Sequence, residues 1–254
     1  QVSHFHVAGK MTQRSIEKSL KQLSQNWVGS DVEIPEIKTS KPPVRSQVYF
    51  IDIPGAKQSA ITLGTLSIPG GNPELYKYSV VNNRLGGGME ARLMRTLRLE
   101  KGYTYGAGSF FRENSYQTPF YAYSQVRSNV TLESLEIFKN IINSYAESYN
   151  SEDLELTKNK LIKQNALRFE RLGSLLNMLD TISKFNFPDT YIQEQQDVLR
   201  SMNLEDAKSI AQSEFNADKM YFVIAGDAKT QLSRIKELGY GNPIMLDREG
   251  NTIK

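Results

Sequence analysis

Arg98 and Tyr105 are the residues whose types and spacing best suit chemistry at a carbonyl group. Arg98 stands near the end of an expected helix, and Tyr105 follows seven residues later in an expected strand. Because Gly102 ends the helix between them, the chain reverses there and both side chains can approach one pocket. A guanidinium is a rigid fork of N–H donors, and a phenol carries one O–H donor. Such a pair suits a backbone carbonyl or a developing oxyanion.

The elements that must position this pair are a glycine loop, a basic helix and an aromatic strand. Three consecutive glycines precede the helix and predict a flexible loop, since glycine reaches backbone angles that other residues avoid. Residues 91–100 predict a helix in which Leu93 and Leu97 share one face. Together these elements form a surface suited to an extended peptide. Its candidate binding residues, besides Arg98 and Tyr105, are Gly86, Gly87, Gly88, Arg92 and Tyr103.

Composition indicates a folded soluble protein. The chain has 254 residues, of which 39% are hydrophobic and 23% are charged. The formal charge is +3 without a basic cluster, so we expect no nucleic-acid binding. The absence of cysteine excludes disulfides and thiolate metal sites. No apolar run approaches the roughly 20 residues of a membrane span. Because the sequence starts at Gln1 without methionine, we expect a processed product or an excised fragment.

Hydrophobic periodicity predicts strands and helices on either side of a proline-containing linker at 28–46. Expected strands are 4–8, 48–54, 60–68, 103–112, 120–128 and 219–225, with a turn at 54–57. Expected helices are 12–27, 72–85, 91–100, 131–149, 151–170, 173–185, 189–200, 204–215 and 230–238.

Two short segments near the two ends of the chain are similar in sequence. Phe5–Gly9 and Phe222–Gly226 are similar, and a helix is expected after each. This similarity favours an internal repeat. The alternative is that Val-Ala-Gly after a strand is simply common.

The two histidines, His4 and His6, do not predict a metal site. They alternate along an expected strand and so share one face. A zinc site needs three or four ligands, and neither H-E-x-x-H nor H-x-x-E-H occurs in the sequence. We interpret both as ordinary strand residues. A serine triad and a phosphate loop are also discounted, because their G-x-S-x-G and Gly-Lys-Ser/Thr motifs are absent.

The central stretch resembles the signature of the second, non-catalytic half of the insulinase/pitrilysin zinc metallopeptidase family, which includes the mitochondrial processing peptidases. The residues that carry the resemblance are Leu85, Gly86, Gly87, Arg92, Leu93, Leu97, Arg98, Gly102 and Tyr105. Ala91 replaces the family's usual serine. Pro54, Gln58 and the segment 222–226 also fall where the family has them, so the resemblance covers essentially the whole chain.

The resemblance implies an α+β fold, with a mostly antiparallel sheet of about five to six strands packed on a layer of helices as half of a clamshell. Residues 1–27 would be the last strand and helix of a preceding homologous half. Residues 28–46 would be the interdomain linker, and residues 47–254 the C-terminal metallopeptidase-like domain. The linker would then follow the first unit of the internal repeat.

The resemblance also implies a function. Zinc and its glutamate base would lie on the homologous partner half, upstream in the same chain or in a separate subunit. This chain would bind no cofactor, contact the peptide substrate through Arg98 and Tyr105, and be inactive alone. The alternative is a non-peptidase homologue that serves structure or assembly. The sequence does not decide the compartment, and bacterial members of the family occur in the cytoplasm or the periplasm.

Overall fold

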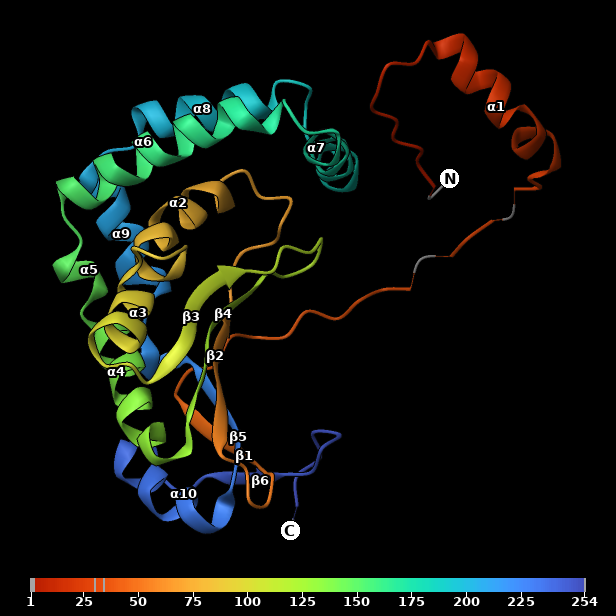
Figure 1. The fold of residues 1–254 in the computed structure, drawn as a ribbon. Coiled ribbons are helices and arrows are strands. Elements are labelled where there is room, and N and C mark those ends of the chain that lie inside the picture. Colours follow the sequence, from red (N-terminus) through yellow and green to blue (C-terminus); the bar gives the residue numbers. More distant parts are fainter. Residues whose placement is uncertain (1–2, 30, 34, 254) are drawn as a thin grey trace.

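A six-stranded mixed sheet forms the centre of the molecule, and helices cover one of its faces (Figure 1). The structure is a computed structural model that describes residues 3–29, 31–33 and 35–253. The strands are β1 (Gln47–Asp52), β2 (Gln58–Leu66), β3 (Thr104–Phe111), β4 (Pro119–Arg127), β5 (Tyr221–Gly226) and β6 (Ile244–Leu246). The expected α+β fold, with one sheet and one helical layer, is confirmed.

The sheet has the strand order β3-β4-β2-β5-β1-β6. The pairs β3–β4, β4–β2 and β2–β5 are antiparallel, whereas β5–β1 and β1–β6 are parallel. The expected turn between β1 and β2 is present, with Gly55 at φ +74° and a hydrogen bond from the Ala56 N–H to the Ile53 carbonyl oxygen (3.1 Å). The two strands it joins are nevertheless not neighbours, because β5 lies between them.

Buried and exposed side chains alternate along the strands, as expected for a sheet with only one covered face. In β4, Phe120, Ala122 and Val126 are buried, while Tyr123 and Gln125 between them are exposed. Successive strand side chains point to opposite faces, so the buried set faces the helices and the other set forms an open face.

The helical layer is built from residues 75–100, 131–214 and 228–238. Its α-helices are α2 (Leu75–Gly86), α3 (Arg92–Met94), α4 (Thr131–Asn143), α5 (Tyr145–Ser148), α6 (Ser151–Arg168), α7 (Leu172–Phe185), α8 (Tyr191–Ser201), α9 (Leu204–Glu214) and α10 (Ala228–Ile235). The shorter helical turns are η1 (Arg95–Glu100, a π-helix) and the 3-10 turns η2 (Ser128–Val130), η3 (Ala217–Lys219) and η4 (Lys236–Leu238).

Three helix predictions need correction. The helix expected from residue 72 begins at Leu75, because the Asn72 side chain accepts a hydrogen bond from the Glu74 N–H (3.0 Å) and holds a turn there. The helix expected over 91–100 divides into α3 and the π-helix η1. The helix expected over 131–149 is interrupted at Ser144, where α4 ends and α5 begins.

The first 29 residues contain one helix and no strand among the residues described. The helix α1 (Gln13–Asn26) is capped by Thr12, as predicted, and none of its residues is buried. The strand predicted at 4–8 is wrong for this structure, since residues 3–8 have no strand partner. Between Val28 and Ser46 the described residues form neither helix nor strand. Ser40 is nevertheless fixed to the Gln117 amide group by two hydrogen bonds of 3.1 and 2.7 Å.

Candidate functional site

Arg98 lies in the π-helix that follows the glycine loop. The Lys101 N–H donates to the Thr96 carbonyl oxygen (3.0 Å), five residues earlier, which widens the last turn. Such turns are rare and often occur at functional sites. Leu97 is fully buried here, whereas the neighbouring Arg98 is exposed. The Arg98 guanidinium donates only a long hydrogen bond to the Met89 sulfur (3.6 Å) among the described residues, so its donors point to solvent.

The predicted helix stop at Gly102 is confirmed. Its φ of +63° is the left-handed conformation that glycine adopts without strain. The N–H groups of Gly102 and Tyr103 donate to the carbonyl oxygens of Arg98 (3.2 Å) and Leu97 (2.9 Å). The chain therefore reverses directly between the predicted arginine and the strand that carries the predicted tyrosine.

Tyr105 projects from a bulge at the start of β3. The register of β3 against β4 shifts between Thr104 and Ala107. The Thr104 hydroxyl supports the bulge by accepting from the Gly106 N–H (3.0 Å). A bulge redirects a side chain, and Tyr105 is 88% exposed. No hydrogen bond joins Arg98 and Tyr105 in the described residues, so the binding of one ligand by both side chains stays a prediction.

The glycine loop is held by close packing. A Cβ added to Gly86 would lie 2.1 Å from the Ser109 backbone nitrogen, because α2 ends directly against β3. A Cβ on Gly87 would lie 2.7 Å from the Asn83 Cα, and Gly88 has a φ of +147°. Gly86 and Gly87 are thus required by the fold, and their predicted role in peptide binding is untested.

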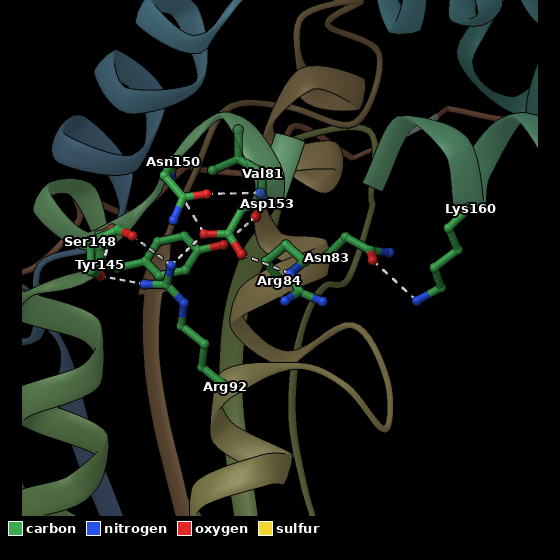
Figure 2. Close-up of polar contacts among 9 residues, drawn as sticks. All are labelled: Val81, Asn83, Arg84, Arg92, Tyr145, Ser148, Asn150, Asp153 and Lys160. Carbon is green, nitrogen blue, oxygen red and sulfur yellow. Dashed lines mark hydrogen bonds and ion pairs between the residues drawn. The ribbon is translucent and has the colours of Figure 1, made fainter. Parts of the chain in front are cut away.

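Lys160 of α6 ties this loop to the helical layer. Its ammonium group donates to the side-chain oxygen of Asn83 in α2 (3.1 Å), as Figure 2 shows. It also donates to the Gly87 carbonyl oxygen in the loop (3.2 Å). The loop expected to be flexible is therefore anchored from a helix more than seventy residues later in the sequence.

Asp153, also on α6, bridges the two helices on either side of the loop (Figure 2). Its buried carboxylate accepts from Arg84 Nε of α2 (2.9 Å) and from Arg92 Nη2 of α3 (2.5 Å). Arg92 also donates to the Ser148 carbonyl oxygen (2.8 Å) and lies 4.8 Å from the centre of the Tyr145 ring. Its guanidinium thus serves packing, and the predicted binding role of Arg92 is untested.

Sequence reasoning missed Asp153 and Lys160. The available signal for Asp153 was its position three residues after Asn150, which together form a capping box at the start of α6. That signal identifies a helix start and says nothing of Arg84 and Arg92, which are distant in the sequence. Lys160 gave no comparable signal, because its partners Asn83 and Gly87 are distant in the sequence and are known only from the fold.

Two tyrosines beside the Asp153 cluster are shielded from water. Burial raises the pKa of the Tyr145 phenol well above its usual value. Burial, and then the nearby Asp153 charge, raise the pKa of Tyr149 to about 12. The Tyr145 hydroxyl donates a hydrogen bond to the Val81 carbonyl oxygen (2.6 Å). Because both pKa values are raised, both phenols are neutral packing groups near neutral pH.

The sequence profile of the family described as Peptidase M16 inactive domain matches residues 4–161. The chain belongs to this family. The predicted family resemblance is thereby confirmed at the level of an inactive M16 peptidase-like domain. The match begins within the N-terminal segment and includes the glycine loop, Arg98, Tyr105 and most of α6.

Two curated relatives are each 23% identical to the chain over the aligned residues. One is the "Non-peptidase homolog YmxG" of Helicobacter pylori, aligned over 222 residues, which are 84% of this chain and 50% of that protein. The other is the "Uncharacterized zinc protease YmxG" of Bacillus subtilis, aligned over 220 residues, 84% of this chain and 51% of that protein. The chain thus spans about half the length of the curated relatives it matches.

A solved structure agrees in fold. A crystal structure of a peptidase M16 inactive domain from Pseudomonas fluorescens superposes with a TM-score of 0.75 at 24% identity, covering 86% of this chain and 52% of that chain. At this identity the match establishes the half-clamshell fold and leaves the activity open.

Within the described residues, no group of three or more His, Cys, Asp or Glu side chains is arranged to hold a metal ion. In the same residues, no helix has the length and apolar character needed to cross a bilayer.

Proposed function

We propose that this chain is the substrate-binding half of a zinc metalloendopeptidase, with the zinc site on a homologous partner half. The observation that carries the proposal is the exposure of Arg98 and Tyr105 on either side of the Gly102 reversal. Tyr105 is 88% exposed, and among the described residues Arg98 donates only the long hydrogen bond to the Met89 sulfur (3.6 Å). Both side chains are therefore available to a ligand.

The chain's own residues do not fit a zinc site. Its two histidines, His4 and His6, stand in the N-terminal segment with ring centres 6.4 Å apart, and no third His, Cys, Asp or Glu completes a group with them in the described chain. Zinc would therefore be supplied by the partner half.

The Arg98–Tyr105 side of the domain would hold an extended peptide by its backbone. The Tyr105 hydroxyl would donate to a carbonyl oxygen at the scissile bond, and Arg98 would donate to a neighbouring carbonyl. Donors aimed at a developing oxyanion contribute strongly because they are fixed beforehand, and losing one costs about a hundredfold or more in rate. Lys160 and Asp153 would contribute by fixing the loop and helix that carry Arg98.

The partner half would precede residue 28 in the same chain or belong to another subunit. The strand β5, which contains Phe222–Gly226, pairs in parallel with β1. Because Phe5–Gly9 is similar in sequence to Phe222–Gly226, Phe5–Ala8 would form the corresponding parallel pair within a preceding half. Its strand partner would lie in that half. Residues 1–27, 28–46 and 47–254 would then be the end of that half, the linker and the C-terminal domain.

A second candidate is a non-peptidase homologue with a structural or assembly role. It is favoured by the name of the Helicobacter pylori relative, a non-peptidase homologue. Under this alternative Arg98 and Tyr105 would have no peptide to hold.

Peptide binding to the full chain separates the two candidates. We expect Arg98→Ala to weaken binding of an unstructured, fluorescently labelled peptide about tenfold, since one charge-assisted hydrogen bond contributes roughly 1.5–3 kcal/mol. Arg95→Ala is the matched control, because Arg95 is an exposed arginine of the same π-helix, paired only with exposed Glu100 (3.0 Å). Equal affinity of both variants and the unmodified chain would contradict the proposed site, and no binding at all would favour the second candidate.

A further inference from the structure

The open face of the sheet carries almost no charge. The outward positions of the four central strands are occupied by aromatic, aliphatic, small and amide side chains, with Arg127 at one end as the exception. They are Gln47, Tyr49 and Ile51 of β1, Tyr221, Val223 and Ala225 of β5, Gln58, Ala60, Thr62, Gly64 and Leu66 of β2, and Tyr121, Tyr123, Gln125 and Arg127 of β4. A sheet face exposed only to water normally carries polar and charged residues. A sheet face with several exposed aromatic rings and a single charged side chain at its end indicates that something covers it.

Aromatic rings cluster on this face near β3. The Phe110 ring lies 5.5 Å from that of Tyr121 and 5.7 Å from that of Tyr123, in tilted and edge-on arrangements that aromatic pairs favour. Tyr123 leans over Gly108, since a Cβ added there would lie 3.4 Å from the Tyr123 hydroxyl. The ring is thus held in place and is still 47% exposed.

A shallow groove lies between this ring and the middle of β2. Its floor and walls include Gln58, Ala60, Thr62, Tyr105, Tyr123 and Gln125. The small side chains of Ala60 and Thr62 leave the space open. The groove is continuous with the proposed peptide site, because Tyr105 lines it. No Asp, Glu, Lys or Arg lines it.

We propose that this groove receives an uncharged side chain of the bound peptide, preferably aromatic or large aliphatic, and that Tyr123 determines the preference. This inference rests on the proposed function, since it assigns a side-chain pocket to the same peptide. An aromatic or aliphatic side chain gains free energy by leaving water against Tyr123. A lysine or aspartate would lose hydration there without meeting an opposite charge. The expected ligands are therefore peptides with an aromatic or large aliphatic residue at this position.

The test uses the full chain and three labelled, unstructured peptides that differ only at one central residue: Phe, Lys or Asp. We expect the Phe peptide to bind about tenfold more tightly than the other two. Tyr123→Ala should reduce this preference to less than about twofold, while Tyr123→Phe, which keeps the ring, should retain it. Tyr116→Ala is the control, because Tyr116 is an exposed tyrosine in the β3–β4 connection, away from the groove.

The outcomes separate this inference from the proposed function. Equal binding of all three peptides, unchanged by Tyr123→Ala, would overturn the groove assignment and leave peptide binding at Arg98 and Tyr105 intact. Binding of no peptide would overturn both. A change of oligomeric state in Tyr123→Ala, with unchanged peptide preference, would show that a protein surface covers the face and would overturn the groove assignment as well.

Discussion

The ammonium group of Lys160 lies 3.2 Å from the carbonyl oxygen of Gly87, and this contact fastens the glycine loop to α6. The loop leads directly into α3 and the π-helix that carries Arg98. We expect Lys160→Ala to increase amide hydrogen exchange in residues 86–90, because the loop loses the hydrogen bond that Lys160 donates to its backbone. Peptide affinity should fall severalfold. Lys163→Ala, a change at an exposed lysine of the same helix, should alter neither quantity.

Asp153→Asn should strongly destabilise the domain. The carboxylate is buried and neutralises Arg84 and Arg92, and removing one partner of a buried ion pair costs about 3–5 kcal/mol. The free energy of unfolding in urea measures the effect. Glu155→Gln is the control on the same helix. The Glu155 carboxylate is 63% exposed where it pairs with Lys158 (3.4 Å), so its loss should cost less than about 1 kcal/mol. Similar costs for both variants would show that the cluster contributes little.

Gly86→Ala and Gly173→Ala should have opposite effects on stability. The added methyl group at Gly86 would meet the β3 backbone at 2.1 Å and force the strand and helix apart, costing about 1–3 kcal/mol or more. At Gly173, in the first turn of α7, nothing lies within 4 Å, so alanine should stabilise by roughly 0.4–1 kcal/mol by restricting the unfolded chain. Thermal unfolding of the two variants checks the difference in sign.

Alkaline unfolding should depend on Tyr149. Its pKa is raised to about 12 in the folded protein, above the ordinary value of 10.0. Its contribution to stability is therefore complete below pH 10 and is lost as the pH rises towards 12, because the unfolded state releases the phenolic proton first.

Tyr149→Phe removes that titration. The free energy of unfolding of the variant should fall less steeply between pH 10 and pH 12, by up to about 1.4 kcal/mol per pH unit. Urea unfolding at several pH values measures the slope, with Tyr105→Phe as the control at an exposed side chain. Parallel slopes for Tyr149→Phe and the unmodified chain would contradict the shifted pKa.

Local signals in the sequence predicted local structure well. The stop at Gly102, the cap at Thr12 and the turn at Gly55 were all confirmed, because each depends on one residue type and its immediate neighbours. Leu93 and Leu97, which were predicted to share one helix face, are both buried. The family resemblance, carried by the residues around Arg98, was confirmed by the profile match.

What the sequence could not predict depends on contacts between distant residues. The insertion of β5 between β1 and β2 joins residues near 50 and 224, and no local pattern specifies it. The short strand β6 exists only because it pairs with β1. The ion pair between Asp153 and Arg92 likewise joins residues that are distant in the sequence. The segment 4–8 has a strand-like sequence without a strand partner in this structure.

Reconstituted peptide cleavage is the measurement we would make first. The chain would be assayed alone and mixed with a homologous half that carries the H-x-x-E-H motif, with zinc quantified in each sample. We expect cleavage only in the mixture, zinc that follows the partner half, and a rate about a hundredfold lower with Tyr105→Phe. Stoichiometric zinc in this chain alone, or an unchanged rate in the Tyr105→Phe mixture, would contradict its assignment as the substrate-binding half.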